Sequence, residues 1–196
     1  MRNQLTGNEK FMLGGEDLDL TISEFWSWAY SDLLNNTYRG VLAEFIVYKS
    51  LQIPLSSLKM PDKHAMRVDW EPYDIKSPSG RRIEVKSAAY LQAWENDYYS
   101  KILFSIAPRR AWSPEQGYSP ECKRQSDLYV FCIYTALTRE KSILDLDLWD
   151  FYVLATSTLN QKVLEQKSIS LPSLLKLKPV KTDYSHLAQV IEELEL

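Results

Sequence analysis

The chain has 196 residues, 45% of them hydrophobic and 12% aromatic, which is enough to bury a sizeable core in one domain. A net charge of −3 and a pI of about 5.5 exclude the global basic field of many non-specific nucleic-acid binders. Any contact with a polyanion therefore has to be local. We predict a single domain over residues 1–196, in which residues 1–20 could form a peripheral N-terminal segment.

The sequence also argues against a secreted or membrane protein. The N-terminus lacks an apolar core of signal-peptide length, and nowhere do about 18 apolar residues follow one another. Cys122 and Cys132 have no CxxC spacing and no histidine nearby, which argues against a disulfide framework and a zinc site. We expect a soluble, cytoplasmic protein.

Residues 21–51 are predicted to form two helices, because apolar side chains recur there at helical spacing. The residues that show this spacing are Phe25, Trp28, Ala29, Leu33, Val41, Leu42, Phe45 and Ile46. We expect the break between the helices at "NNTYRG", residues 35–40, and expect Trp26, Trp28 and Trp94 to pack in the core. On the second helix Glu44 lies beside the apolar stripe.

Residues 56–69 are polar and irregular, and the following "WEPYDIKSPSGRRIEVKSAAY" is typical of two strands joined by the turn "SPSG". Alternation places Asp74 on the face opposite Ile75. In the second strand it places Glu84 and Lys86 on the face opposite Val85. The hairpin thus carries a charged face and an apolar face.

Further strands are predicted within 101–107, 126–137 and 149–159, and the second of these is apolar on both faces, as in the middle of a covered sheet. Helices are expected over 170–177, capped by Ser170, and over 185–196. Residues 108–125 are predicted to be the longest loop. These elements indicate an α/β (α+β) fold with a central mixed β-sheet flanked by helices.

The charged face of the hairpin could form a metal site. Same-face residues of neighbouring antiparallel strands lie within side-chain reach, so Asp74 and Glu84 can converge, with Lys86 one pleat along. Paired carboxylates repel each other unless a cation lies between them, and such oxygen ligands suit Mg²⁺ or Mn²⁺. Glu44 could add a ligand through water, or instead pair with Lys49 or Arg39 as an ordinary helix residue.

Asp74, a short hairpin and Glu84-Val85-Lys86 after an acidic helix resemble the PD-(D/E)xK, restriction-endonuclease-like nuclease superfamily. The resemblance spans residues 37–135. It implies a restriction-endonuclease-like core, Asp74 and Glu84 as metal ligands, Lys86 as the catalytic lysine and Glu44 as the helical acid that many members have. Tyr73 stands where the family motif has proline.

The function that the resemblance implies is Mg²⁺-dependent or Mn²⁺-dependent hydrolysis of DNA. A homodimer is also implied, because many nucleases of this type cut both strands as dimers. Five polar residues could contact the nucleic acid, although exposed turn and loop residues are usually just solvated. They are Arg81, Arg82, Arg109, Arg110 and Gln92.

Two other interpretations stay open at the level of sequence. ExK is a common tripeptide, so Glu84 and Lys86 could belong to an ordinary solvated strand face. The chain could also be a catalytically inactive domain of the same fold that binds nucleic acid or a protein partner. An enzyme acting on another kind of substrate is a third reading, and no feature of the sequence points to a substrate for it.

Overall fold

The computed structural model describes residues 5–51, 72–94, 98–113 and 117–196. This part of the chain folds into a mixed α and β structure with a five-stranded sheet and five α-helices. The irregular segment predicted at 56–69 lies outside the described residues. Within the described ranges, the search for a helix long and apolar enough to cross a membrane finds none.

The central sheet has the strand order β11 (Val180–Thr182), β9 (Trp149–Ala155), β8 (Leu128–Tyr134), β4 (Arg82–Ala89) and β3 (Ile75–Lys76). β4 and β8 run parallel, and every other neighbouring pair is antiparallel, so the sheet is mixed as predicted. All seven residues of β8 are buried. The prediction of a central strand that is covered on both faces is confirmed.

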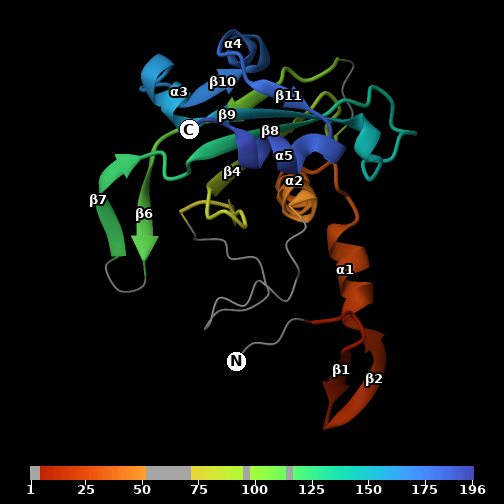
Figure 1. Cartoon of the computed structure of the whole chain (residues 1–196). Coiled ribbons are helices and arrows are strands. Elements are labelled where there is room, and N and C mark those ends of the chain that lie inside the picture. Colours follow the sequence, from red (N-terminus) through yellow and green to blue (C-terminus); the bar gives the residue numbers. More distant parts are fainter. Residues whose placement is uncertain (1–4, 52–71, 95–97, 114–116) are drawn as a thin grey trace.

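Helices cover the sheet on one face, and a smaller layer covers the other (Figure 1). The first face packs against α2 (Asn36–Ser50) and α5 (Tyr184–Glu193), with Ile83 and Val85 of β4 in that core. The second core joins Ala88 and Phe131 to side chains from α3 (Thr156–Lys162), α4 (Leu171–Lys176) and the paired strands β5 (Leu103–Ser105) and β10 (Ser168–Ser170). β4 therefore contributes to both cores.

Local capping explains where several helices begin. Thr21 and Glu24 form a capping box at α1 (Ile22–Tyr30), and Ser170 caps α4, as predicted. The predicted break at 35–40 is wrong, because Asn35 is the N-cap of α2 and the "NTYRG" that follows it is helical. The break lies at residues 31–35, between the two helices.

The N-terminal part of the chain extends away from the sheet (Figure 1). It consists of the hairpin β1 (Lys10–Leu13) and β2 (Glu16–Thr21), followed by α1, which has no buried residue. Trp26 is 37% exposed, Trp28 is 84% exposed and Trp94 is 53% exposed. The expectation that the tryptophans pack in the core is therefore wrong for these residues, since neither α1 nor the segment after β4 is covered there by another described layer.

Two other predictions are corrected. Residues 108–125 are not a loop but carry the antiparallel strands β6 (Arg109–Ser113) and β7 (Gly117–Lys123), which project from the molecule (Figure 1). Because this ribbon has no covered face, its sequence lacks the alternation that identifies a half-buried strand. The strand predicted over 149–159 ends at Ala155, and α3 begins at Thr156. A 3₁₀ helix, η2 (Leu146–Leu148), precedes β9.

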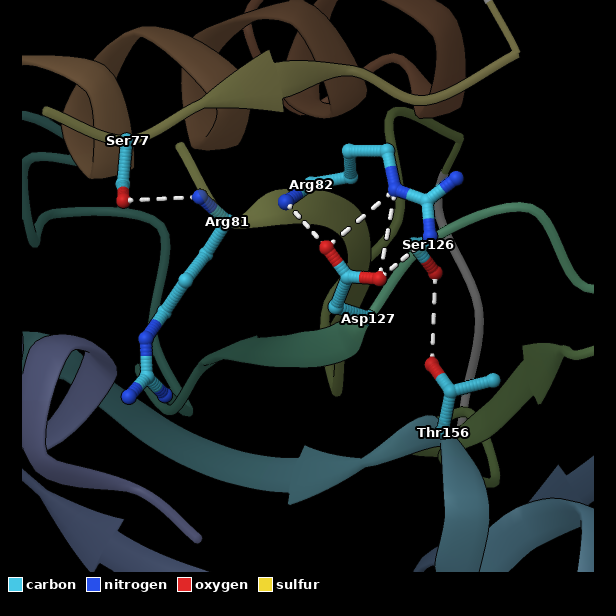
Figure 2. Close-up of polar contacts among 6 residues, drawn as sticks. All are labelled: Ser77, Arg81, Arg82, Ser126, Asp127 and Thr156. Carbon is cyan, nitrogen blue, oxygen red and sulfur yellow. Dashed lines mark hydrogen bonds and ion pairs between the residues drawn. The ribbon is translucent and has the colours of Figure 1, made fainter. Parts of the chain in front are cut away.

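Asp127 joins the beginnings of the central strands (Figure 2). Its carboxylate accepts a bond from the Arg82 amide at 2.8 Å and forms an ion pair with the Arg82 guanidinium. Its backbone amide donates to the Arg82 carbonyl at 2.8 Å, and its carbonyl accepts from the Thr156 amide at 2.9 Å. Nearby, the hydroxyls of Ser126 and Thr156 lie 3.4 Å apart. This residue therefore sets the register of β4 against β8.

Replacing Asp127 by alanine should lower the free energy of unfolding at pH 7 by about 1 kcal/mol, because the Arg82 amide and guanidinium both lose an acceptor. The Arg82 hydrogen bond lowers the pKa of Asp127, so this stabilisation is complete above the unfolded pKa of about 4 and is lost as the pH falls through the folded pKa. Urea unfolding at pH 7 and pH 3 measures both effects. Asp147→Ala, an exposed acid on η2, is the matched control, and equal losses in both variants would contradict the assignment.

Candidate functional site

The register of the β3–β4 hairpin brings the two predicted metal ligands together. Ile75 faces Ile83, and the Asp74 amide donates to the Ile83 carbonyl at 3.0 Å, so Asp74 lies opposite Glu84. Asp74 Oδ2 accepts a hydrogen bond from the Val85 amide at 2.7 Å. This bond fixes the Asp74 carboxylate beside the middle residue of the Glu84-Val85-Lys86 sequence.

Lys86 lies on the same face of β4 and forms an ion pair with Glu84. The distance from Lys86 Nζ to Glu84 Oε1 is 2.5 Å, and the two side chains are only 19% and 15% exposed. The pair is thus largely removed from water, where a charge-assisted hydrogen bond is stronger than at an open surface. The hairpin therefore carries three of the four predicted catalytic residues, with Glu84 and Lys86 in direct contact and Asp74 opposite Glu84 in the register.

Glu44, the fourth residue, approaches from α2. It is half-buried next to the fully buried Ala43, and its negative charge contributes to raising the pKa of Asp74. The helical acid and the hairpin acids therefore belong to one electrostatic cluster. Sequence spacing alone could not show this, because the hairpin and the helix are far apart in the chain.

The pKa of Asp74 is raised to about 6. Protein atoms around the carboxyl group displace water, and this is the largest cause; the charge of Glu84 comes next, opposed by Lys86 and the Val85 amide. Asp74 keeps an exposed surface, so its desolvation is incomplete, and the nearby acids push the pKa in the same direction. A proton or a cation at Asp74 would relieve this repulsion.

The donor set fits a magnesium or manganese ion. Asp74 and Glu84 offer carboxylate oxygens side by side, and Mg²⁺ is usually held by one or two carboxylates together with water and substrate phosphate oxygens. In the described ranges no cluster of three or more Asp, Glu, His or Cys side chains has metal-holding geometry.

The five predicted nucleic-acid contacts lie on three segments: Arg81 and Arg82 at the start of β4, Arg109 and Arg110 on β6, and Gln92 after β4. The Arg82 guanidinium pairs with Asp127 (Figure 2). Arg81 Nη1 donates to the Leu194 carbonyl at 2.6 Å. Arg109 and Arg110 lie exposed on β6. Gln92 is buried, and its Nε2 donates to the Ala89 carbonyl at 3.0 Å. Arg81 and Arg82 thus have structural partners that the turn sequence did not reveal.

Sequence reasoning missed two features of this region. The Val85 amide that orients Asp74 is a backbone group, so no residue type signals it. Arg39 was weighed only as a partner for Glu44, whereas it is buried at the start of α2. Its position four residues before the buried Ala43, on the apolar face of the helix, is a signal that could have identified it.

The comparisons with known proteins add no relative. No protein-family model matches the chain, and the search of curated proteins finds no significant match.

Because the pKa of Asp74 is raised, the folded state favours the protonated carboxyl, and stability should fall as the pH rises from about 4 to about 6. Asp74→Asn removes the charge and can still accept the Val85 bond. At pH 8 in EDTA it should raise the free energy of unfolding by about 1 kcal/mol, discounted for the solvent access of Asp74.

Urea unfolding at pH 8 and pH 4 measures this difference, which should vanish at the lower pH. Asp147→Asn on η2 controls for the general effect of removing an exposed negative charge. A destabilised Asp74→Asn variant at pH 8 would contradict the electrostatic account.

Proposed function

We propose that the chain is a metal-dependent nuclease that hydrolyses phosphodiester bonds of DNA. Asp74 and Glu84 hold Mg²⁺ or Mn²⁺, Lys86 is the catalytic lysine and Glu44 is the auxiliary acid. The observation that supports the proposal best is the meeting of Asp74 and Glu84 across the β3–β4 hairpin, with Lys86 bonded to Glu84. An ordinary solvated strand face does not require a carboxylate with a raised pKa at this point.

Asp74 and Lys86 have distinct tasks in this proposal. Asp74 is held by the Val85 amide, so its second oxygen can be presented in a fixed direction. Lys86 has three N–H donors and uses one on Glu84, which leaves donors for a phosphate oxygen or for the attacking water. When bound, the metal ion would polarise the phosphate and lower the pKa of its water.

The order of elements supports the family assignment within the proposal. An acidic helix α2, the short antiparallel pair β3 and β4, and the buried parallel strand β8 are similar to the restriction-endonuclease-like core. Fold alone does not determine activity, so the argument rests on the charged cluster. DNA as substrate, and a homodimer that cuts both strands, are parts of the proposal that come from the resemblance.

The ion pair between Lys86 and Glu84 favours a second candidate function. In a domain of this fold that binds nucleic acid or protein without catalysis, the same pair would simply neutralise two half-buried charges. Such a domain would not need a metal ion. The two candidates therefore differ in how DNA integrity and protein stability respond to Mg²⁺.

The proposed activity is tested by incubating the protein with linear, circular and single-stranded DNA in Mg²⁺, Mn²⁺ or EDTA. Cleavage should require the metal and should fall at least about 100-fold in Asp74→Asn, Glu84→Gln and Lys86→Met, because each removes a ligand or the phosphate-directed charge. Asp147→Asn should cleave like the unmodified protein.

Circular dichroism of each variant separates loss of chemistry from loss of fold. If the unmodified protein leaves all three DNAs intact, and Mg²⁺ fails to raise its thermal midpoint, the binding domain is the better account. Full cleavage by the Lys86→Met variant would instead overturn the role of the lysine.

A further inference from the structure

A cavity of about 340 Å³ lies beyond Lys86, between the first turn of α2 and the last residues of β4. Among the described residues that line it, the polar ones are uncharged or basic, and none is acidic. The polar residues that line it are Asn36, Arg39, Ser87, Gln92, Ser100 and Lys101. The cavity therefore offers an environment for a ligand with negative charge.

Arg39 supplies a buried positive charge to this cavity. Its side chain is only 4% exposed, with Nη1 donating to the Leu34 carbonyl at 2.9 Å and Nη2 donating to Asn36 Oδ1 at 2.6 Å. Both acceptors are neutral, and Nε has no hydrogen-bond partner in the described part of the chain. Burial away from water lowers the pKa of Arg39 to about 10. An unneutralised buried charge is costly unless an anion joins it.

Gln92 supplies a buried acceptor to the same cavity. The residue is 9% exposed, and its Nε2 donates to the Ala89 carbonyl at 3.0 Å. This bond fixes the amide orientation, because a carbonyl can only accept a hydrogen bond. The opposite end of the amide, Oε1, is buried, and no described residue donates to it. A ligand that fits must therefore donate a hydrogen bond as well as carry a negative charge.

A nucleotide meets both requirements, since its phosphate can accept from Arg39 and its sugar or base can donate to Gln92. Water could bond to each polar atom but could not neutralise the guanidinium. Lys101 adds a second positive charge, and Asn36 lies in the first turn of α2, where the helix dipole favours an anion. We propose that this cavity binds a nucleotide, with Arg39 contacting the phosphate and Gln92 orienting the sugar or base.

The position of the cavity links it to the candidate catalytic site. Ser87, Ala88 and Ala89 line it and directly follow Lys86 on β4, so at roughly 3.3 Å per residue it begins about 3 to 10 Å further along the strand. A nucleotide held there would belong to the same DNA strand as the bond at Asp74 and Glu84. This identification of the ligand as a strand rests on the proposed function, whereas binding of a nucleotide does not require cleavage.

The test uses Gln92→Glu, which leaves the size of the side chain unchanged and adds a negative charge to the lining of the cavity. Binding of a fluorescent single-stranded oligonucleotide is measured by anisotropy in EDTA, so that no cleavage is needed. Thermal shifts with inorganic phosphate and with deoxyadenosine monophosphate separate free anions from a nucleotide. Gln161→Glu, an exposed glutamine on α3, is the matched control.

The dissociation constant for the oligonucleotide should rise at least tenfold in Gln92→Glu and stay unchanged in Gln161→Glu. The far-UV circular dichroism of Gln92→Glu without ligand should match that of the unmodified protein, which excludes misfolding as the cause, although its thermal midpoint should be lower because a carboxylate cannot donate to the Ala89 carbonyl. Deoxyadenosine monophosphate should raise the midpoint of the unmodified protein and not that of Gln92→Glu.

Equal oligonucleotide binding by Gln92→Glu and the unmodified protein would overturn the proposal. So would a thermal shift with inorganic phosphate but none with deoxyadenosine monophosphate, because the cavity would then hold only a free anion. Nucleotide binding that depends on Gln92, in a protein that cleaves no DNA, would support the cavity assignment and reject the proposed nuclease. DNA cleavage by the unmodified protein, together with unchanged oligonucleotide binding by Gln92→Glu, would support the proposed nuclease and reject the cavity assignment.

Discussion

The parallel pairing of β4 with β8 is the constraint on which both the sheet and the candidate site depend. The register runs without interruption from Ile83 opposite Leu128 to Ala89 opposite Tyr134. Because β8 is buried along its whole length, β4 must also lie deep in the protein, and it supplies apolar side chains to the cores on both faces. The charged residues Glu84 and Lys86 are tolerated within such a strand because they neutralise each other.

Because β3 is short, it covers only part of the edge of β4. β3 pairs with β4 only through Ile75 and Lys76, so beyond Val85 this edge of β4 has no strand partner in the described part of the chain. The Asp74 carboxylate accepts the hydrogen bond of the Val85 amide, in place of a backbone carbonyl. That arrangement holds a carboxylate against Glu84 despite their repulsion, and farther along the same strand lies the cavity that the buried Arg39 lines. Two phosphate groups of one nucleic-acid strand could occupy these two places.

Much of this architecture could be predicted from the sequence, and the failures have physical causes. The all-apolar run of β8 and the alternation around Glu84 and Lys86 identify the central strands, because burial on one or two faces constrains residue type. The β6–β7 ribbon was missed because its exposed faces impose no such pattern. Likewise, the partner of Arg82 is fixed by a tertiary contact with Asp127, which local sequence does not encode.

The central claim is that Asp74 and Glu84 share one divalent cation. Isothermal titration of the protein with Mn²⁺ at pH 8 tests this claim without any assumption about substrate. The account predicts one ion bound per chain in the unmodified protein, with affinity reduced at least about tenfold in Asp74→Asn and again as the pH falls below 6, where a proton competes for Asp74. Equal Mn²⁺ affinity in the unmodified protein and in Asp74→Asn would contradict it.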